Sequence, residues 1–212
     1  GFAEFLQQHE EDLTKEKKQE MLQIIVQNAR KMSNIIDELM LLAGIRKKEV
    51  IPQEVDMALT LYGAKQRLTD TIQSHHAEIV TPEKWPTAMG YAPWIEEVWV
   101  NYLSNGIKYG GRPPKLEVGY DDEENGYVRF WVRDNGIGIS KEKQMELFSM
   151  FTRLDQAKAK GHGLGLSIVQ RIVKRLGGKV GVESEEGAGS LFWFSLPASK
   201  NENQASTQSH VK

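Results

Sequence analysis

The sequence contains no cysteine among its 212 residues. A disulfide framework, a thiolate zinc site and a cysteine nucleophile are therefore excluded. The sequence also has no run of 18 apolar residues, and no basic stretch followed by an apolar one at its N-terminus. We therefore expect neither a membrane-spanning helix nor a signal peptide in these residues.

An excess of charge of one sign is lacking too. The chain has 27 basic and 29 acidic residues, which gives a net charge of −2. Binding to nucleic acid or to an anionic membrane surface usually depends on a basic excess, so we expect neither partner. The length suffices for one core with an appendage or for two small domains, and no internal repeat is visible.

Residues 1–46 predict two helices joined by a polar turn. Apolar residues of the second helix recur at alternating spacings of three and four, which is a heptad seam: Leu22, Ile25, Ala29, Met32, Ile36, Leu39 and Ala43. Such a seam needs partner helices, and pairing of this hairpin with a second copy would make a four-helix bundle in a homodimer. A helix that packs within its own chain is the alternative.

The rest of the chain predicts an α+β domain at 55–197, after a linker at 47–54 and before a polar tail at 198–212 that we expect to be disordered. Helical patterns cover 59–75, 93–109 and 167–176. Strand patterns cover 78–81, 115–120, 127–133, 180–183 and 191–196, and the last four form two hairpins.

Two asparagines mark the middle helical segment. Asn101 and Asn105 are four residues apart, so both carboxamides lie on one face of the helix. Apolar neighbours such as Trp99 and Leu103 place this face at a buried cleft. Lys108 and Tyr109 follow near the end of the helix; taken alone, each could equally be an ordinary surface or core residue.

Two glycine-rich stretches follow. Asp134-Asn-Gly136-Ile-Gly138 comes directly after an alternating strand, and on its own it is more typical of a plain turn. Its glycines permit positive φ and close approach of the backbone to a ligand. The second stretch, Gly161-His-Gly-Leu-Gly165, opens a helix, where exposed backbone N–H groups favour phosphate.

In this order the three stretches resemble the N, G1 and G2 boxes of the histidine kinase catalytic domain. That domain is a branch of the ATPase superfamily that also holds gyrase B, the Hsp90 chaperones and MutL. The segment Leu147-Phe-Ser-Met-Phe151-Thr-Arg153-Leu resembles the F box between G1 and G2. The likeness runs from about residue 55 to 197, and it implies an α/β sandwich of the Bergerat type that binds ATP and Mg²⁺.

The resemblance assigns roles to individual residues. Asn105 is expected to be the metal ligand, because Mg²⁺ accepts one carboxamide oxygen together with phosphates and waters. Asp134 is expected to accept a hydrogen bond from the amine of adenine, which predicts ATP over GTP because guanine presents a carbonyl oxygen there. The remaining expected nucleotide-binding residues are Lys108, Tyr109, Gly136, Gly138, Arg153, Gly161, Gly163, Leu164, Gly165 and Leu166.

The residue at position 101 separates the reaction classes of this superfamily. Members that activate water carry Glu one turn before the magnesium-binding Asn, as a general base. Asn101 cannot take a proton at neutral pH, so the pocket should hold ATP without rapid hydrolysis. We therefore expect Asn101, Asn105 and Arg153 to serve phosphate transfer to an external nucleophile. The alternatives are a nucleotide-binding regulatory module and a gyrase- or Hsp90-type ATPase.

One expected motif of the family is missing from the sequence. Histidine kinases phosphorylate a histidine in a motif that resembles His-Glu-x-x-x-Pro, and His9-Glu10 is not followed by that proline. We expect the phosphoacceptor to precede Gly1, and the phosphate to pass on to an Asp of a response regulator receiver domain. The resemblance also favours the homodimer and a cytoplasmic kinase core, within a full-length protein that could be membrane-anchored.

Overall fold

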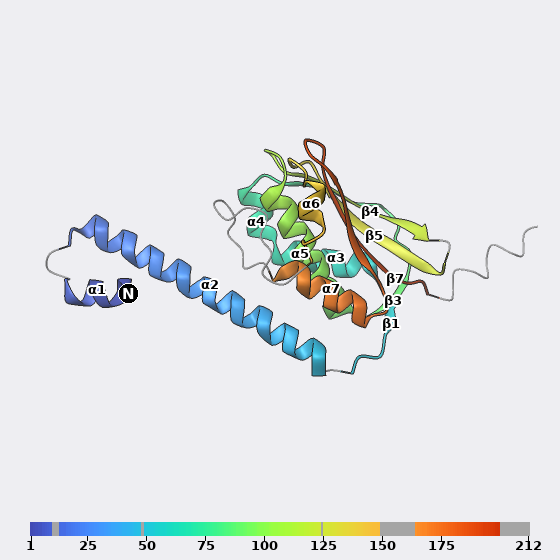
Figure 1. Cartoon of the computed structure of the whole chain (residues 1–212), viewed down its shortest axis with the longest axis horizontal. Coiled ribbons are helices and arrows are strands. Elements are labelled where there is room, and N and C mark those ends of the chain that lie inside the picture. Colours follow the sequence, from blue (N-terminus) through green and yellow to red (C-terminus); the bar gives the residue numbers. More distant parts are fainter. Residues whose placement is uncertain (10–12, 48, 124, 149–163, 200–212) are drawn as a thin grey trace, which may run out of the picture. The chain divides into compact units, whose positions relative to one another are not determined.

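The computed structural model describes residues 1–9, 13–47, 49–123, 125–148 and 164–199 (Figure 1). The chain divides into two compact units, residues 1–46 and 47–212. In the described ranges no helix is both long enough and apolar enough to cross a bilayer.

The first unit consists of two helices, α1 (Phe2–Gln8) and α2 (Lys15–Lys47). α2 begins before the apolar seam, because residues 15–20 are charged or amide residues that favour a helix without needing burial. The seam is largely exposed in the single chain: Leu22 is 53%, Met32 60% and Ile36 58% exposed.

A five-stranded sheet forms one layer of the second unit, in the order β2-β4-β5-β7-β6. β2 runs parallel to β4, and the other neighbours are antiparallel. The strands are β2 (Glu78–Val80), β4 (Lys115–Glu123), β5 (Tyr127–Asp134), β6 (Val180–Glu185) and β7 (Gly189–Pro197). A separate two-stranded sheet pairs β1 (Gln53–Val55) with β3 (Ala88–Gly90).

Helices form the other layer (Figure 1). They are α3 (Met57–Arg67), α4 (Thr69–Ser74), α5 (Ala92–Tyr109), α6 (Lys141–Gln144) and α7 (Gly165–Arg175). α5 packs against α3 and α7 and against β4 and β5, while α7 packs against β6 and β7. Trp99 of α5 fills the centre, with its ring centroid 5.0 Å from that of Phe194 and 6.3 Å from that of Phe130. The expected α/β sandwich is confirmed.

Some local predictions are wrong. The single helix expected at 59–75 is broken at Leu68, whose backbone (φ −102°, ψ 9°) ends α3 and precedes α4. The elements β1, β3 and α6 were not predicted, because three or four residues carry little periodicity, although the equally short β2 was predicted at 78–81. Gln53 and Glu54, which we assigned to the linker, lie in β1.

The first two residues of the tail expected at 198–212 contact the domain. Ala198 forms a bridge with Ala88, and the Ser199 N–H donates to the Thr87 carbonyl oxygen at 3.3 Å. Ser199 is buried, and its hydroxyl donates to Glu54. These contacts attach Ala198 and Ser199 to the domain beyond the end of β7. Residues 200–212 lie outside the described residues.

Candidate functional site

Helix α5 presents the two asparagines at the edge of the core. Pro93 lies in its first turn, where a missing N–H costs no helical hydrogen bond. Asn101 and Asn105 are half-buried, and Asn105 Nδ2 donates to Asn101 Oδ1 at 3.1 Å. Because its amide nitrogen is used in this bond, Asn105 has its oxygen as the acceptor to offer to a ligand.

Lys108 and Tyr109 lie in the last turn of α5 and contact each other. Lys108 Nζ donates to the Tyr109 hydroxyl at 2.9 Å and lies 4.6 Å from the ring centroid. Tyr109 is 41% exposed. A cation and an accessible aromatic face therefore share one end of the helix.

Asp134 is the last residue of β5 and is only 7% exposed. Burial raises the pKa of its carboxyl above the ordinary value, while backbone N–H bonds from Gly136 and Ser190 work in the opposite direction. The Gly136 N–H lies 2.8 Å from Asp134 Oδ1. Asp134 also lies close to α5, since a Cβ built on Gly106 would be 3.8 Å from the Asp134 Cβ.

The turn after Asp134 is held by the hairpin of β6 and β7. Gly138 has φ +72°, a conformation that residues with side chains rarely adopt. The Ile139 N–H donates to Ser184 Oγ at 2.8 Å, and the Gly187 N–H donates to the Ile137 carbonyl oxygen at 2.7 Å. This loop is therefore tied to a neighbouring hairpin at two points.

Gly165, the last residue of the second glycine-rich stretch, lies against α5 at Asn101. Gly165 is the first residue of α7, and a Cβ on Gly165 would overlap the Asn101 carboxamide. Leu164 is buried and Leu166 is half-buried. Among the described residues, no side chain caps α7 at its N-cap position, Leu164. A helix N-terminus of this kind suits phosphate oxygens.

Four of the residues singled out above lie outside the described residues: Phe151, Arg153, Gly161 and Gly163. Their roles stay predictions. Of the segment that resembles the F box, Leu147 is buried and Phe148 is half-buried. Glu97, one turn before Asn101, forms two bonds to the Arg67 guanidinium at 2.7 and 3.3 Å. It links α5 to α3, which is a structural contact.

Three residues that support the site were not singled out in the sequence. Asn135 Oδ1 accepts from the Gly111 and Lys115 N–H groups at 2.8 and 2.9 Å. Gln144 Nε2 donates to the Ile139 and Ser184 carbonyl oxygens at 2.7 and 2.9 Å. Ser184 stands between Glu183 and Glu185 in β6, so nothing local distinguishes its hydroxyl from the polar residues around it. The partners of Asn135 and Gln144 are set by long-range packing and leave no local signal.

The donor groups near Asn105 fit one kind of metal. Among the residues that the structure describes, no group of three His, Cys, Asp or Glu side chains could hold an ion. A single carboxamide oxygen matches Mg²⁺, which takes most of its ligands from water and phosphate. A metal here would therefore depend on a nucleotide bound beside the helix.

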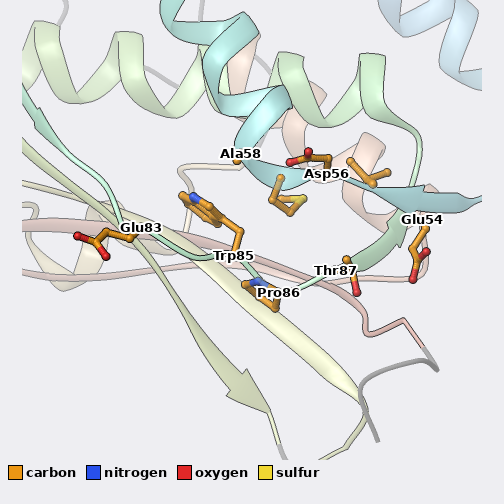
Figure 2. Close-up of a pocket in the computed structure, with 9 residues that line it drawn as sticks. Glu54, Asp56, Ala58, Glu83, Trp85, Pro86 and Thr87 are labelled. Atoms are coloured by element: carbon orange, nitrogen blue, oxygen red, sulfur yellow. The ribbon is translucent and has the colours of Figure 1, made fainter. Parts of the chain in front are cut away.

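A cavity of about 470 Å³ lies in another part of the second unit (Figure 2). It is lined by β1, the start of α3 and the segment before β3, with Asp56, Glu83 and Trp85 among its walls. Asp56 already accepts a hydrogen bond from the Leu59 N–H at 3.0 Å and caps α3. None of the predicted nucleotide-binding residues that the structure describes lines this cavity.

Comparison with known proteins connects these stretches to one family. A family model described as "Histidine kinase-, DNA gyrase B-, and HSP90-like ATPase" matches residues 90–200. The methanogenesis regulatory histidine kinase FilI of Methanothrix harundinacea is 32% identical over 199 residues, which cover 93% of this chain and 22% of FilI. The chain thus spans less than a quarter of the length of that curated relative.

Solved structures share the fold. Full-length ShkA in complex with AMPPNP has a TM-score of 0.72 at 24% identity, over 88% of this chain and 40% of ShkA. The histidine kinase ThkA in complex with the response regulator TrrA has a TM-score of 0.72 at 21% identity, over 93% of this chain and 57% of that one. At these identities the likeness shows the architecture alone.

Proposed function

The chain belongs to the histidine kinase-, DNA gyrase B- and HSP90-like ATPase family, and on this premise we propose that it is the ATP-binding kinase core of a two-component sensor histidine kinase. The observation that carries the proposal is the convergence of three separate motifs on helix α5. Asp134 lies close to α5 at Gly106, Gly165 touches Asn101, and Asn105 bonds to Asn101. Three motifs with unrelated structural roles would not be expected to lie together at one helix, so their proximity favours a shared binding site.

Each group around α5 has a part in nucleotide binding. The buried Asp134 carboxylate accepts the adenine amine, with Tyr109 near the purine. The N-terminus of α7 and Lys108 bind phosphate oxygens. Asn105 supplies the protein ligand of Mg²⁺, which neutralises phosphate charge when bound.

The proposed reaction transfers the γ-phosphoryl group to histidine. A nitrogen–phosphorus bond forms at the imidazole, the bond between phosphorus and the β–γ bridging oxygen breaks, and ADP leaves. The imidazole gives up its proton to solvent. A receiver-domain aspartate of a response regulator then takes the phosphoryl group. Positioning and charge stabilisation account for most of such catalysis, so the pocket needs no base of its own.

Asn101 favours transfer to histidine over hydrolysis. Its oxygen accepts the Asn105 amide at 3.1 Å, and a carboxamide cannot deprotonate water. The alternative is an ATPase of the gyrase or Hsp90 type, in which this position would be a general base. Slow release of phosphate from ATP by the chain would support the kinase, and rapid turnover would support the ATPase instead.

The exposed seam of α2 supports a homodimer as a second element of the proposal. Leu22, Met32 and Ile36 lie at heptad positions and are all more than half exposed in the single chain. Pairing with a second copy would bury them in a four-helix bundle.

Calorimetry with ATP and Mg²⁺ tests the nucleotide site directly. In Asn105→Ala we expect the gain in ATP affinity caused by Mg²⁺ to disappear, because the metal loses its protein ligand. Ser104→Ala is the matched control on the same helix, since Ser104 Oγ bonds only to the Asn101 carbonyl oxygen at 3.1 Å among the described residues. An Asn105→Ala variant with the wild-type Mg²⁺ dependence would remove Asn105 from this role.

A further inference from the structure

Asn135 joins two segments that flank the proposed adenine site. Its Oδ1 accepts from the N–H groups of Gly111 and Lys115 at 2.8 and 2.9 Å, and its Nδ2 donates to the Pro113 carbonyl oxygen at 3.2 Å. One carboxamide thus binds three backbone groups of the connection between α5 and β4. That connection begins directly after Tyr109.

The backbone on both sides of Asn135 is equally close to the site. Asp134 precedes it, and the Gly136 N–H bonds to the Asp134 carboxylate at 2.8 Å. Gly136 also lies against the end of α5, since a Cβ there would be 2.5 Å from the Tyr109 carbonyl oxygen. The side chain of Asn135 and the backbone of Gly136 therefore fix the same turn to the same helix end.

The opposite side of this turn is fixed independently. Ile139 and Ile137 bond to the β6–β7 hairpin at 2.8 and 2.7 Å. The turn from Asp134 to Ile139 is therefore clamped at both ends, and Asn135 supplies the side-chain clamp toward α5. Loss of that clamp leaves the hairpin side in place and loosens Asn135 and Gly136, whose N–H bonds to the Asp134 carboxylate, while Asp134 itself stays paired in the sheet.

We propose that Asn135 is a positioning residue for adenine: it holds the Asp134–Gly136 backbone against the end of α5, at the spacing that a purine needs. This inference rests on the proposed ATP site. Asn135 touches neither phosphates nor metal in this scheme, so its effect is confined to the base. It acts through Asp134, whose carboxylate must meet the adenine amine within hydrogen-bond distance.

Because Asn135 is exposed, its proposed positioning role can be tested with a variant that still folds. Asn135 lies at the surface, so the backbone groups that it binds can turn to water when its side chain is removed. We therefore expect Asn135→Ala to fold, with a melting temperature within a few degrees of the wild type. Its ligand affinity should fall, because a looser turn holds the carboxylate less well.

The experiment compares adenosine, ADP and ATP well below the melting temperature, by NMR titration for adenosine and calorimetry for the nucleotides. Asn135→Ala should weaken all three by the same factor, about tenfold, which is within the range for weakening the single hydrogen bond between Asp134 and the adenine amine. Asn135→Asp should recover most of the affinity, since a carboxylate still accepts both N–H bonds. Lys108→Ala should instead weaken ADP and ATP more than adenosine.

Arg133→Ala is the matched control. Arg133 is exposed, lies two positions before Asn135 and makes one ion pair with Glu117 at 3.3 Å, so its removal should leave all three affinities unchanged. Wild-type affinity in Asn135→Ala, or a loss confined to ATP, would overturn the inference, and an unfolded variant would assign Asn135 a structural role instead. A wild-type chain that binds none of the three ligands would overturn the proposed function itself.

Discussion

Apolar side chains are distributed differently in the two units of the chain. In the second unit Trp99, Phe130 and Phe194 are completely buried, and their rings contact one another between the sheet and the helices. In the first unit, large apolar side chains along α2 stay exposed, with Met32 at 60% and Met40 at 68%. The second unit completes its core within one chain, whereas the first presents apolar surface that a partner would have to cover.

This difference indicates that the units can be disrupted separately. A sandwich core is stabilised by contacts of residues far apart in sequence, while a long helix forms locally and gains its stability from what packs on it. A substitution in the core should therefore leave the helix seam intact, and a charge in the seam should leave the sandwich folded.

The largest effect is expected from charges in the seam. Ile25→Asp together with Met32→Asp should convert the proposed dimer to a monomer, because buried unpaired carboxylates are strongly unfavourable. Light scattering over a range of concentrations measures the change, and ATP affinity should stay at the wild-type value. Gln23→Asp with Gln27→Asp adds the same charge at exposed positions outside the seam and should leave the dimer intact. A parent chain that is monomeric throughout would contradict the proposed bundle.

A truncation in the core should have the next largest effect. Phe130→Ala removes a fully buried ring whose centroid lies 5.4 Å from that of Phe194 and should lower the free energy of unfolding by about 3–5 kcal/mol. Chemical denaturation followed by tryptophan fluorescence gives the value. Phe5→Ala, a truncation of the same size at a residue that is 44% exposed, is the control. A loss below about 1 kcal/mol in Phe130→Ala would mean that the core relaxes around the gap.

The smallest effect is expected at the site itself. Asp134→Asn replaces the proposed buried acceptor for the adenine amine by a group that can present a donor, at an expected cost of about 1–3 kcal/mol in ATP affinity. GTP should be affected less than ATP, and equal losses would refute recognition of the base by Asp134. Asp121→Asn is the control, because Asp121 is an exposed carboxylate on β4 that pairs with Arg129 at 3.0 Å.

The same variant predicts a change in pH dependence. Burial raises the pKa of Asp134 above its ordinary value of 3.8, so the folded chain holds this proton more tightly than the unfolded chain. The contribution of Asp134 to stability is therefore lost as the pH rises from that ordinary value through the raised pKa. ATP binding needs the ionised carboxylate and should strengthen over the same range. Asp134→Asn should lack both trends, as measured by unfolding and calorimetry at stepped pH.

The sequence predicted the elements with strong periodicity. α5 combines proline in its first turn with a continuous apolar face, and β5 alternates between buried and half-buried positions, so the positions of Asn101, Asn105 and Asp134 could be expected. The pairing of β1 with β3 could not, because each has only three residues and the partners lie far apart in sequence. The break at Leu68 is also hidden, since leucine favours helices and gives no local signal of an end.

The supporting side chains of the site were the hardest to predict. Asn135 stands in an Asp-Asn-Gly run, where asparagine is an ordinary turn residue, and nothing local identifies Pro113 and Lys115 as its partners. Gln144 resembles any exposed glutamine until the fold brings Ile139 and Ser184 to it. Such residues depend on tertiary contacts that a single sequence does not encode locally.

The place of β7 in the sheet has a consequence for biosynthesis. β7 comes last of the described strands along the chain, yet it lies between β5 and β6 and forms the second neighbour of β5. A ribosome must therefore deliver residues 189–197 before β6 can join the sheet, and the Ser190 N–H reaches the Asp134 carboxylate only then. A nascent chain halted before Gly189 has made every described strand that precedes β7 but lacks the Ser190 bond to the proposed adenine acceptor, so we expect nucleotide binding during translation only after β7 has been made.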